Sequence, residues 1–148
     1  MIAYIGLGSN LGNGSSNLDR AVELLGESAG RVLYTSKYIE SEPWGFESQH
    51  RFTNAVTVIE TDLDPMALLD VTQQIERQMG RTHKRRHRSE SYHDRVIDLD
   101  LLLCDDLQIA NERLTLPHPL IEERDFVRLP LAECRAWIID NGQLRIHN

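Results

Sequence analysis

The stretch from Val96 to Leu103 is strongly apolar, yet it contains two carboxylates, Asp98 and Asp100, placed two residues apart. An apolar run of this kind is typical of a strand that is covered on both faces. Because side chains alternate along a strand, both carboxylates would point to the same face, roughly 6.5 Å apart. Two ionised carboxylates on a half-buried surface repel each other unless a cation lies between them. The pair therefore predicts either a divalent cation site suited to Mg²⁺ or a solvent-facing polar stripe on an edge strand, and taken alone it favours neither.

The segment 81–95, which precedes this strand, is rich in basic residues. It holds six of the sixteen Lys and Arg residues and only two acids, so its net charge is +4 against −11 for the rest of the chain. A solvated loop is the usual explanation for such a run. Arg95, however, lies three residues before Asp98, where its guanidinium could bind a phosphate that a cation also contacts. The asymmetry favours a small anionic ligand over an extended nucleic-acid surface.

Other polar positions carry weaker signals. Four glycines lie within residues 6–14, but the spacing of Gly6, Gly8 and Gly12 misses the dinucleotide-binding fingerprint by one residue. We interpret this segment as a tight turn from a strand to a helix, which argues against a hydride-transfer enzyme of the doubly wound type. Asn54 and His118, taken singly, are equally compatible with ordinary structural roles.

The composition is that of an ordinary globular domain. The 148 residues are 41% hydrophobic and 26% charged, which predicts a single domain, 1–148, with a genuine core. No apolar stretch approaches the roughly 20 residues of a membrane span. The two cysteines, Cys104 and Cys134, lack a CxxC spacing, so we expect a reduced, cytoplasmic protein. We expect no nucleic-acid or membrane partner and a monomeric state.

The hydrophobic periodicity predicts a regular order of elements. Strands are expected over 2–7, 31–40, 51–61 and 96–103. One helix is expected from a Ser16/Asp19 capping box to Gly26, and a second from Asp64-Pro65 to Gly80. This β-α-β-β-α-β order predicts an α+β, ferredoxin-like fold, an antiparallel sheet with both helices on one face, followed by a C-terminal appendage. Short helices are expected over 122–133, and the last fifteen residues give no clear signal.

Six motifs, in their order and spacing, resemble those of the 6-hydroxymethyl-7,8-dihydropterin pyrophosphokinase family of folate biosynthesis. The resemblance runs from Tyr4 to about Leu131. The motifs occupy residues 8–12 (GSNLG), 42–45 (EPWG), 52–55 (FTNA), 73–81 (QQIE…GR), 95–102 (RVIDLDLL) and 113–118 (RLTLPH). The resemblance implies a ferredoxin-like fold and an enzyme that transfers pyrophosphate from ATP to the hydroxymethyl group of the dihydropterin, releasing AMP.

The resemblance also implies roles for individual residues. Two Mg²⁺ ions would be held by Asp98 and Asp100, which together with Arg81 and Arg95 would form the catalytic group. The residues expected on the ATP side are Gln73, Glu76, Lys84, Leu101, Arg113, Thr115 and His118. The residues expected on the pterin side are Ser41, Trp44, Phe52, Asn54 and Phe126.

Two alternatives of a different class stay open at this stage. One is a ferredoxin-like RNA- or nucleotide-binding module without catalysis, which would need aromatic residues on the sheet face and a broad basic surface. The aromatic content of 6% and the net charge of −7 count against it. The other is a non-catalytic relative that binds pterin or nucleotide, which the retained pair of aspartates disfavours.

Overall fold

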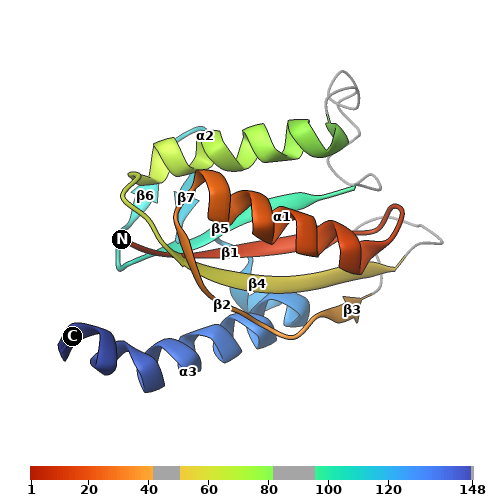
Figure 1. The fold of residues 1–148 in the computed structure, drawn as a ribbon. Helices are drawn as coiled ribbons and strands as arrows, with labels where there is room; N and C mark the ends of the chain where they lie inside the picture. The colour runs from red at the N-terminus through yellow and green to blue at the C-terminus, as the bar shows by residue number, and fades with distance from the viewer. Residues whose placement is uncertain (42–50, 82–95, 148) are drawn as a thin grey trace.

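The computed structural model describes residues 1–41, 51–81 and 96–147, with the backbone alone for residues 81 and 143–147. Four antiparallel strands follow one another in the order β2 (Arg31–Thr35), β4 (Phe52–Glu60), β1 (Ile2–Ser9) and β5 (Asp98–Cys104). A short strand, β3 (Ile39–Ser41), pairs with the start of β4. Figure 1 shows α1 (Gly14–Ser28) and α2 (Pro65–Glu76) together on one face of this sheet. The predicted ferredoxin-like arrangement is confirmed.

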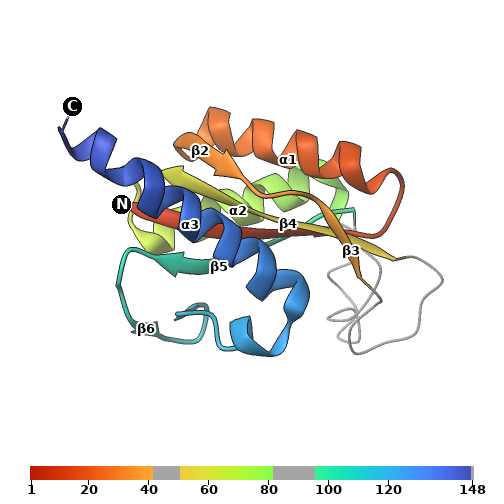
Figure 2. The same ribbon diagram turned by 90° about the horizontal axis from the view of Figure 1, so that it is seen from below.

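A third helix, α3 (Asp125–His147), runs across the opposite face of the sheet (Figure 2). The prediction of short helices over 122–133 was wrong, because only Ile121–Glu123 forms a separate 3-10 turn and α3 continues unbroken to His147. The helix holds together because apolar residues at helical spacing face the sheet. Val127, Leu131, Cys134 and Ile138 all belong to the cluster on that face.

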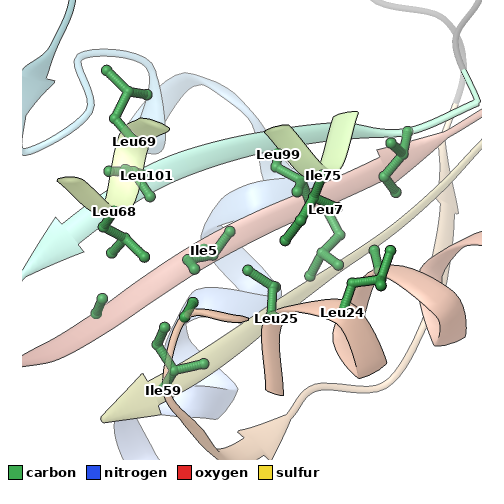
Figure 3. Packing of buried hydrophobic residues seen from close by; sticks show 14 of the residues in the cluster. Ile5, Leu7, Leu24, Leu25, Ile59, Leu68, Leu69, Ile75, Leu99 and Leu101 are labelled. Atoms are coloured by element: carbon green, nitrogen blue, oxygen red, sulfur yellow. The ribbon is translucent and has the colours of Figure 1, made fainter. Parts of the chain in front are cut away.

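The two faces of the sheet carry separate hydrophobic clusters. The larger cluster lies under α1 and α2, where buried side chains of β1 and β5 interlock with those of both helices (Figure 3). Its labelled members are Ile5, Leu7, Leu24, Leu25, Ile59, Leu68, Leu69, Ile75, Leu99 and Leu101. The smaller cluster lies under α3 and includes Tyr4, Val56, Val58 and Leu102. Each core strand therefore buries alternate residues on opposite faces.

The ends of α1 and α2 show which sequence signals were correct. Asp64 caps α2 as predicted, because its carboxylate accepts the N–H of Ala67 at 2.8 Å. The capping box proposed at Ser16 was wrong: Asn13 is the cap, and its side chain accepts the N–H of Ser16 at 3.0 Å. After α2, a π-type turn spans Arg77–Arg81 and contains Gly80, whose φ of 112° suits glycine.

The predicted strand 31–40 is divided into β2 and β3. Between them the backbone N–H of Lys37 donates to the carboxylate of Glu133 on α3 instead of to a neighbouring strand. Two short strands, β6 (Ile109–Ala110) and β7 (Thr115–Leu116), form a separate antiparallel pair. Within the described ranges no helix is long and apolar enough to cross a membrane.

Candidate functional site

The two aspartates of β5 point to the face of the sheet on which α3 lies. Leu102 belongs to the cluster under α3, and Asp98 and Asp100 share its face because residues two apart in a strand point the same way. Leu99 and Leu101 point to the opposite face and are buried under α2. Both aspartates are only partly buried. The strand therefore presents two carboxylates at solvent while an apolar core anchors the residues between them.

Glycines lie opposite both aspartates on the neighbouring strand β1. Gly8 pairs with Asp98 and Gly6 with Asp100, and on its other side Gly8 pairs with Asn54 of β4. Gly6 and Gly8 were predicted to lie at the end of the first strand and in a turn, but β1 extends to Ser9 and both lie within it. A Cβ on Gly8 would lie only 3.3 Å from Asn54 Oδ1 and 3.6 Å from a ring carbon of Phe52. The central strand therefore provides a floor without side chains between Asn54 and the aspartates.

One side of this floor is formed by β3 and β4. Asn54 is buried and donates from Nδ2 to Ser41 Oγ at 2.8 Å. Ser41 also pairs with Phe52 in the sheet, so three residues predicted on the pterin side lie together. Phe52 is partly exposed, which leaves an aromatic ring beside the glycine floor. The arrangement combines a flat apolar surface with a fixed amide.

The other side is formed by α2, β7 and the segment that follows β7. Arg113 donates from its guanidinium to Asp70 at 2.7 Å and to Gln73 at 3.0 Å, both on α2. Gln73 and Arg113, two residues predicted on the ATP side, are thereby in direct contact. Thr115 is exposed on β7, and Leu101 is buried, so only its backbone is available to a ligand.

Two groups bind the backbone of β5 along the edge that does not pair with β1. Glu76, only 5% exposed, accepts the N–H of Leu99 at 2.8 Å. The N–H of His118 donates to the carbonyl of Leu102 at 2.9 Å. Both residues were predicted to contact ATP, and both are held directly against the strand that carries the aspartates.

The surroundings of His118 favour its neutral form over the imidazolium. Burial lowers its pKa, and the nearby guanidinium of Arg124 lowers it further, against a smaller raising effect of Asp98. Its Nδ1 accepts the N–H of Leu120 at 3.1 Å, so the ring proton of the neutral form lies on Nε2. Nε2–H is thus a donor that the hydrogen bond from Leu120 leaves available.

Phe126 lies at the start of α3, and its ring centroid is 5.8 Å from the guanidinium carbon of Arg124. The sequence reasoning missed Arg124, although a single basic residue two positions before the predicted stacking residue was a possible signal. It also missed Asp70, which orients Arg113, and the role of Gly6 and Gly8. Only the register of β1 against β4 and β5 shows that role.

Several predicted site residues are not placed. Trp44, Lys84 and Arg95 lie outside the described residues, and for Arg81 only the backbone is described, at the end of the turn after α2. In the part of the chain that is described, no group of three or more His, Cys, Asp or Glu side chains could hold a metal ion. Burial raises the pKa of Cys104 to about 11 and that of Cys134 to about 12, so neither thiol is a ready nucleophile.

A family model and the curated relatives described below all indicate the same enzyme family. Residues 4–136 match the family model for 7,8-dihydro-6-hydroxymethylpterin-pyrophosphokinase (HPPK). The 2-amino-4-hydroxy-6-hydroxymethyldihydropteridine pyrophosphokinase of Porphyromonas gingivalis is 46% identical over 93% of this chain and 92% of its own. The protein of the same name from Methylorubrum extorquens is 42% identical over 95% of this chain and 87% of its own. The one from Bacillus subtilis is 44% identical over 89% of this chain and 77% of its own.

Solved structures agree at the level of the fold. The Plasmodium falciparum HPPK-DHPS with pteroate matches 86% of this chain with a TM-score of 0.65 and 16% identity. This chain spans 37% of that longer one. A second structure, of an HPPK-DHPS in complex with substrates, gives a TM-score of 0.61 at 15% identity, over 86% of this chain and 39% of its own.

Proposed function

Since the chain belongs to the 7,8-dihydro-6-hydroxymethylpterin-pyrophosphokinase family, we propose that it transfers pyrophosphate from ATP to the hydroxymethyl group of 6-hydroxymethyl-7,8-dihydropterin in folate biosynthesis. The hydroxymethyl oxygen attacks the β-phosphorus, the bond between that phosphorus and the oxygen bridging to the α-phosphorus breaks, and AMP leaves. The alcohol proton is lost to solvent or to a base that we do not assign. The observation that carries the proposal is the floor formed by Gly8 between Asn54 and Asp98.

The pterin occupies the side of the floor formed by β3 and β4. A planar, amide-rich ring system needs a flat surface to stack on and fixed hydrogen-bonding groups at its edge. Phe52 and Phe126 supply aromatic faces, and Asn54, held by Ser41, supplies the amide. Trp44 completes this group by resemblance to the family.

The nucleotide occupies the side formed by α2, β7 and His118. Gln73 and Arg113 are already joined, and the backbone groups of Leu101 and Thr115 lie near them for the adenine. His118 presents its Nε2–H as a neutral donor. Arg81, Lys84 and Arg95 bind phosphates, where guanidinium and ammonium groups are the usual partners.

We further propose that Asp98 and Asp100 hold Mg²⁺, in two ions by resemblance to the family. The donor set fits: the carboxylates share one face, stay partly exposed and face glycines, so there is room for phosphate oxygens and water as further ligands. When bound, Mg²⁺ neutralises charge on the phosphate oxygens. The chain's own residues orient the two substrates, which supplies much of the rate enhancement in phosphoryl-type transfer.

The test is a product analysis with the whole protein. Supplied with ATP, Mg²⁺ and the dihydropterin alcohol, the protein is expected to form AMP and the pterin diphosphate in equal amounts. Omitting the pterin is the control and should leave ATP intact. Formation of ADP alone, or no turnover, would overturn the proposal.

We also propose that the protein works as a monomer in the cytoplasm, which size-exclusion chromatography and cell fractionation would test.

A further inference from the structure

Glu76 is a buried carboxylate that binds backbone, and the reaction as proposed gives it no chemical step. It is 5% exposed at the end of α2, and one of its oxygens accepts the N–H of Leu99 at 2.8 Å. Leu99 lies between Asp98 and Asp100. The hydrogen bond therefore joins α2 to the backbone at the midpoint of the aspartate pair.

The location of this bond is significant because, among the described strands, β5 lies at the end of the order and pairs with β1 alone. An edge strand presents unpaired N–H groups, and its backbone is less constrained than that of a central strand. The direction of the two aspartate side chains depends on the backbone dihedrals of Leu99. Glu76 supplies a partner where the neighbouring strand is missing. Ile75, the preceding residue of α2, packs in the same cluster as Leu99 and adds an apolar contact to the polar one.

A buried carboxylate needs hydrogen bonds to offset its lost hydration, and the Leu99 N–H supplies one. A glutamine oxygen could accept the same N–H without the charge. The residue also links the two halves of the proposed site, because Gln73, one turn earlier on α2, binds Arg113 on the nucleotide side. The helix that orients the nucleotide-side residues thus also fixes the strand that carries the aspartates.

We propose that Glu76 is a positioning residue for the transfer reaction, acting through the Leu99 N–H to hold Asp98 and Asp100 in register with the nucleotide side. This inference rests on the proposed function. Groups that orient metal-binding side chains contribute about 10- to 100-fold to affinity or activity. The hydrogen-bond acceptor, and not the negative charge, is the property that the reaction needs.

The test compares Glu76→Ala with Glu76→Gln, using Thr72→Ala as the matched control. Thr72 is fully buried on the same face of α2, but its hydroxyl donates to Leu69 within the helix. Amide hydrogen exchange at Leu99, kcat and KM for both substrates, and thermal unfolding are measured for each. In Glu76→Ala, exchange at Leu99 is expected to accelerate about tenfold or more, and kcat to fall about 10- to 100-fold, with KM for the pterin unchanged.

The other variants separate positioning from stability. Glu76→Gln is expected to keep Leu99 protected and kcat within about threefold of the wild type, because the acceptor is retained. Thr72→Ala is expected to lower the melting temperature while leaving kcat and Leu99 exchange as they were. Wild-type exchange at Leu99 in Glu76→Ala, or full kcat there, would overturn the inference.

A Glu76→Gln protein that protects Leu99 yet loses kcat tenfold would overturn it too, since charge would then be the essential property. That comparison remains available if Glu76→Ala does not fold. Failure of the proposed function is seen separately, as the absence of AMP formation by the wild type. Exchange at Leu99 still reports on the bond in that case.

Discussion

The proposed role of Asp98 and Asp100 depends on the residues opposite them as much as on their own charge. Across the sheet they face Gly8 and Gly6, so neither carboxylate is covered by a neighbouring side chain of β1. Two carboxylates on one face of a strand repel each other unless a cation lies between them. The pair is therefore a poor choice for stability alone and a good one for holding a metal ion against phosphate.

Replacing either aspartate by asparagine tests whether the pair holds a metal ion. Asp98→Asn and Asp100→Asn are each expected to reduce AMP formation at least about a hundredfold, because a metal ligand is lost. The melting temperature of the metal-free protein should not fall, since repulsion within the pair is relieved. Asp106→Asn, at an exposed aspartate just beyond β5, is the control and should behave as the wild type. A variant at either position with near-normal turnover would refute the metal assignment.

At the scale of the element, β1 acts as a spacer within the site. Its buried residues Ala3, Ile5 and Leu7 face the helices, whereas Gly6 and Gly8 leave the other face open. A strand interior normally disfavours glycine, which often marks close approach of a ligand or another backbone. The glycines therefore support the proposed position of the pterin.

Adding a side chain to this floor should affect pterin binding first. In Gly8→Ala, the new Cβ would meet Asn54 Oδ1 at 3.3 Å and rise between Asn54 and Asp98. Overpacking of this kind typically costs about 1–3 kcal/mol, so KM for the pterin is expected to rise about tenfold, with KM for ATP less affected. Gly26→Ala is the control, because its Cβ would make an ordinary 3.7 Å contact with Val32. An equal rise of both KM values would place the pterin elsewhere.

The whole molecule covers its sheet on both faces, and this affects function and stability together. A ferredoxin-like RNA-binding module uses an exposed sheet face with stacked aromatic residues. Here α3 covers much of that face, and Trp137 of α3 stacks on Tyr34 with a ring separation of 5.4 Å. Among the described residues, Phe52, Asp98 and Asp100 stay partly exposed at the end of this face that carries the glycines. The fold therefore favours small substrates over a nucleic-acid strand.

Burial of His118 links this arrangement to pH. Its folded pKa lies below the ordinary 6.5, so between the two values the unfolded chain binds more protons than the folded one. Stability supplied by the neutral ring is complete above pH 6.5 and is lost as the pH falls through the folded pKa. Each tenfold loss of proton affinity on folding corresponds to about 1.4 kcal/mol.

Urea unfolding at pH 7.5 and 5.5 measures this effect. The wild type should lose more free energy of unfolding between the two pH values than His118→Asn, which keeps an acceptor for the Leu120 N–H but does not titrate. Identical losses in the two proteins would show that the His118 environment does not penalise protonation.

The sequence alone determined the order of the elements, because hydrophobic period and capping are local properties. Asp64-Pro65 starts a helix, and Gly80 breaks the helical geometry in the turn that follows α2, for reasons contained within a few residues. The β-α-β-β-α-β order then limits the fold to few arrangements. Motif spacing identified the family. The full length of α3 was missed, although Val127, Leu131, Cys134 and Ile138 have helical spacing, and the helix continues through Pro130.

Only the tertiary structure decided how the two aspartates are held. That Gly6 and Gly8 face them depends on strand register, which long-range pairing sets and no local pattern reports. The hydrogen bond from the Leu99 N–H to Glu76 joins residues 23 positions apart in sequence, so it depends on where α2 packs against β5. The same packing brings Gln73 to Arg113. Residue types and their order are written in the chain, whereas the contacts that orient Asp98 and Asp100 exist only once the two faces of the sheet are packed.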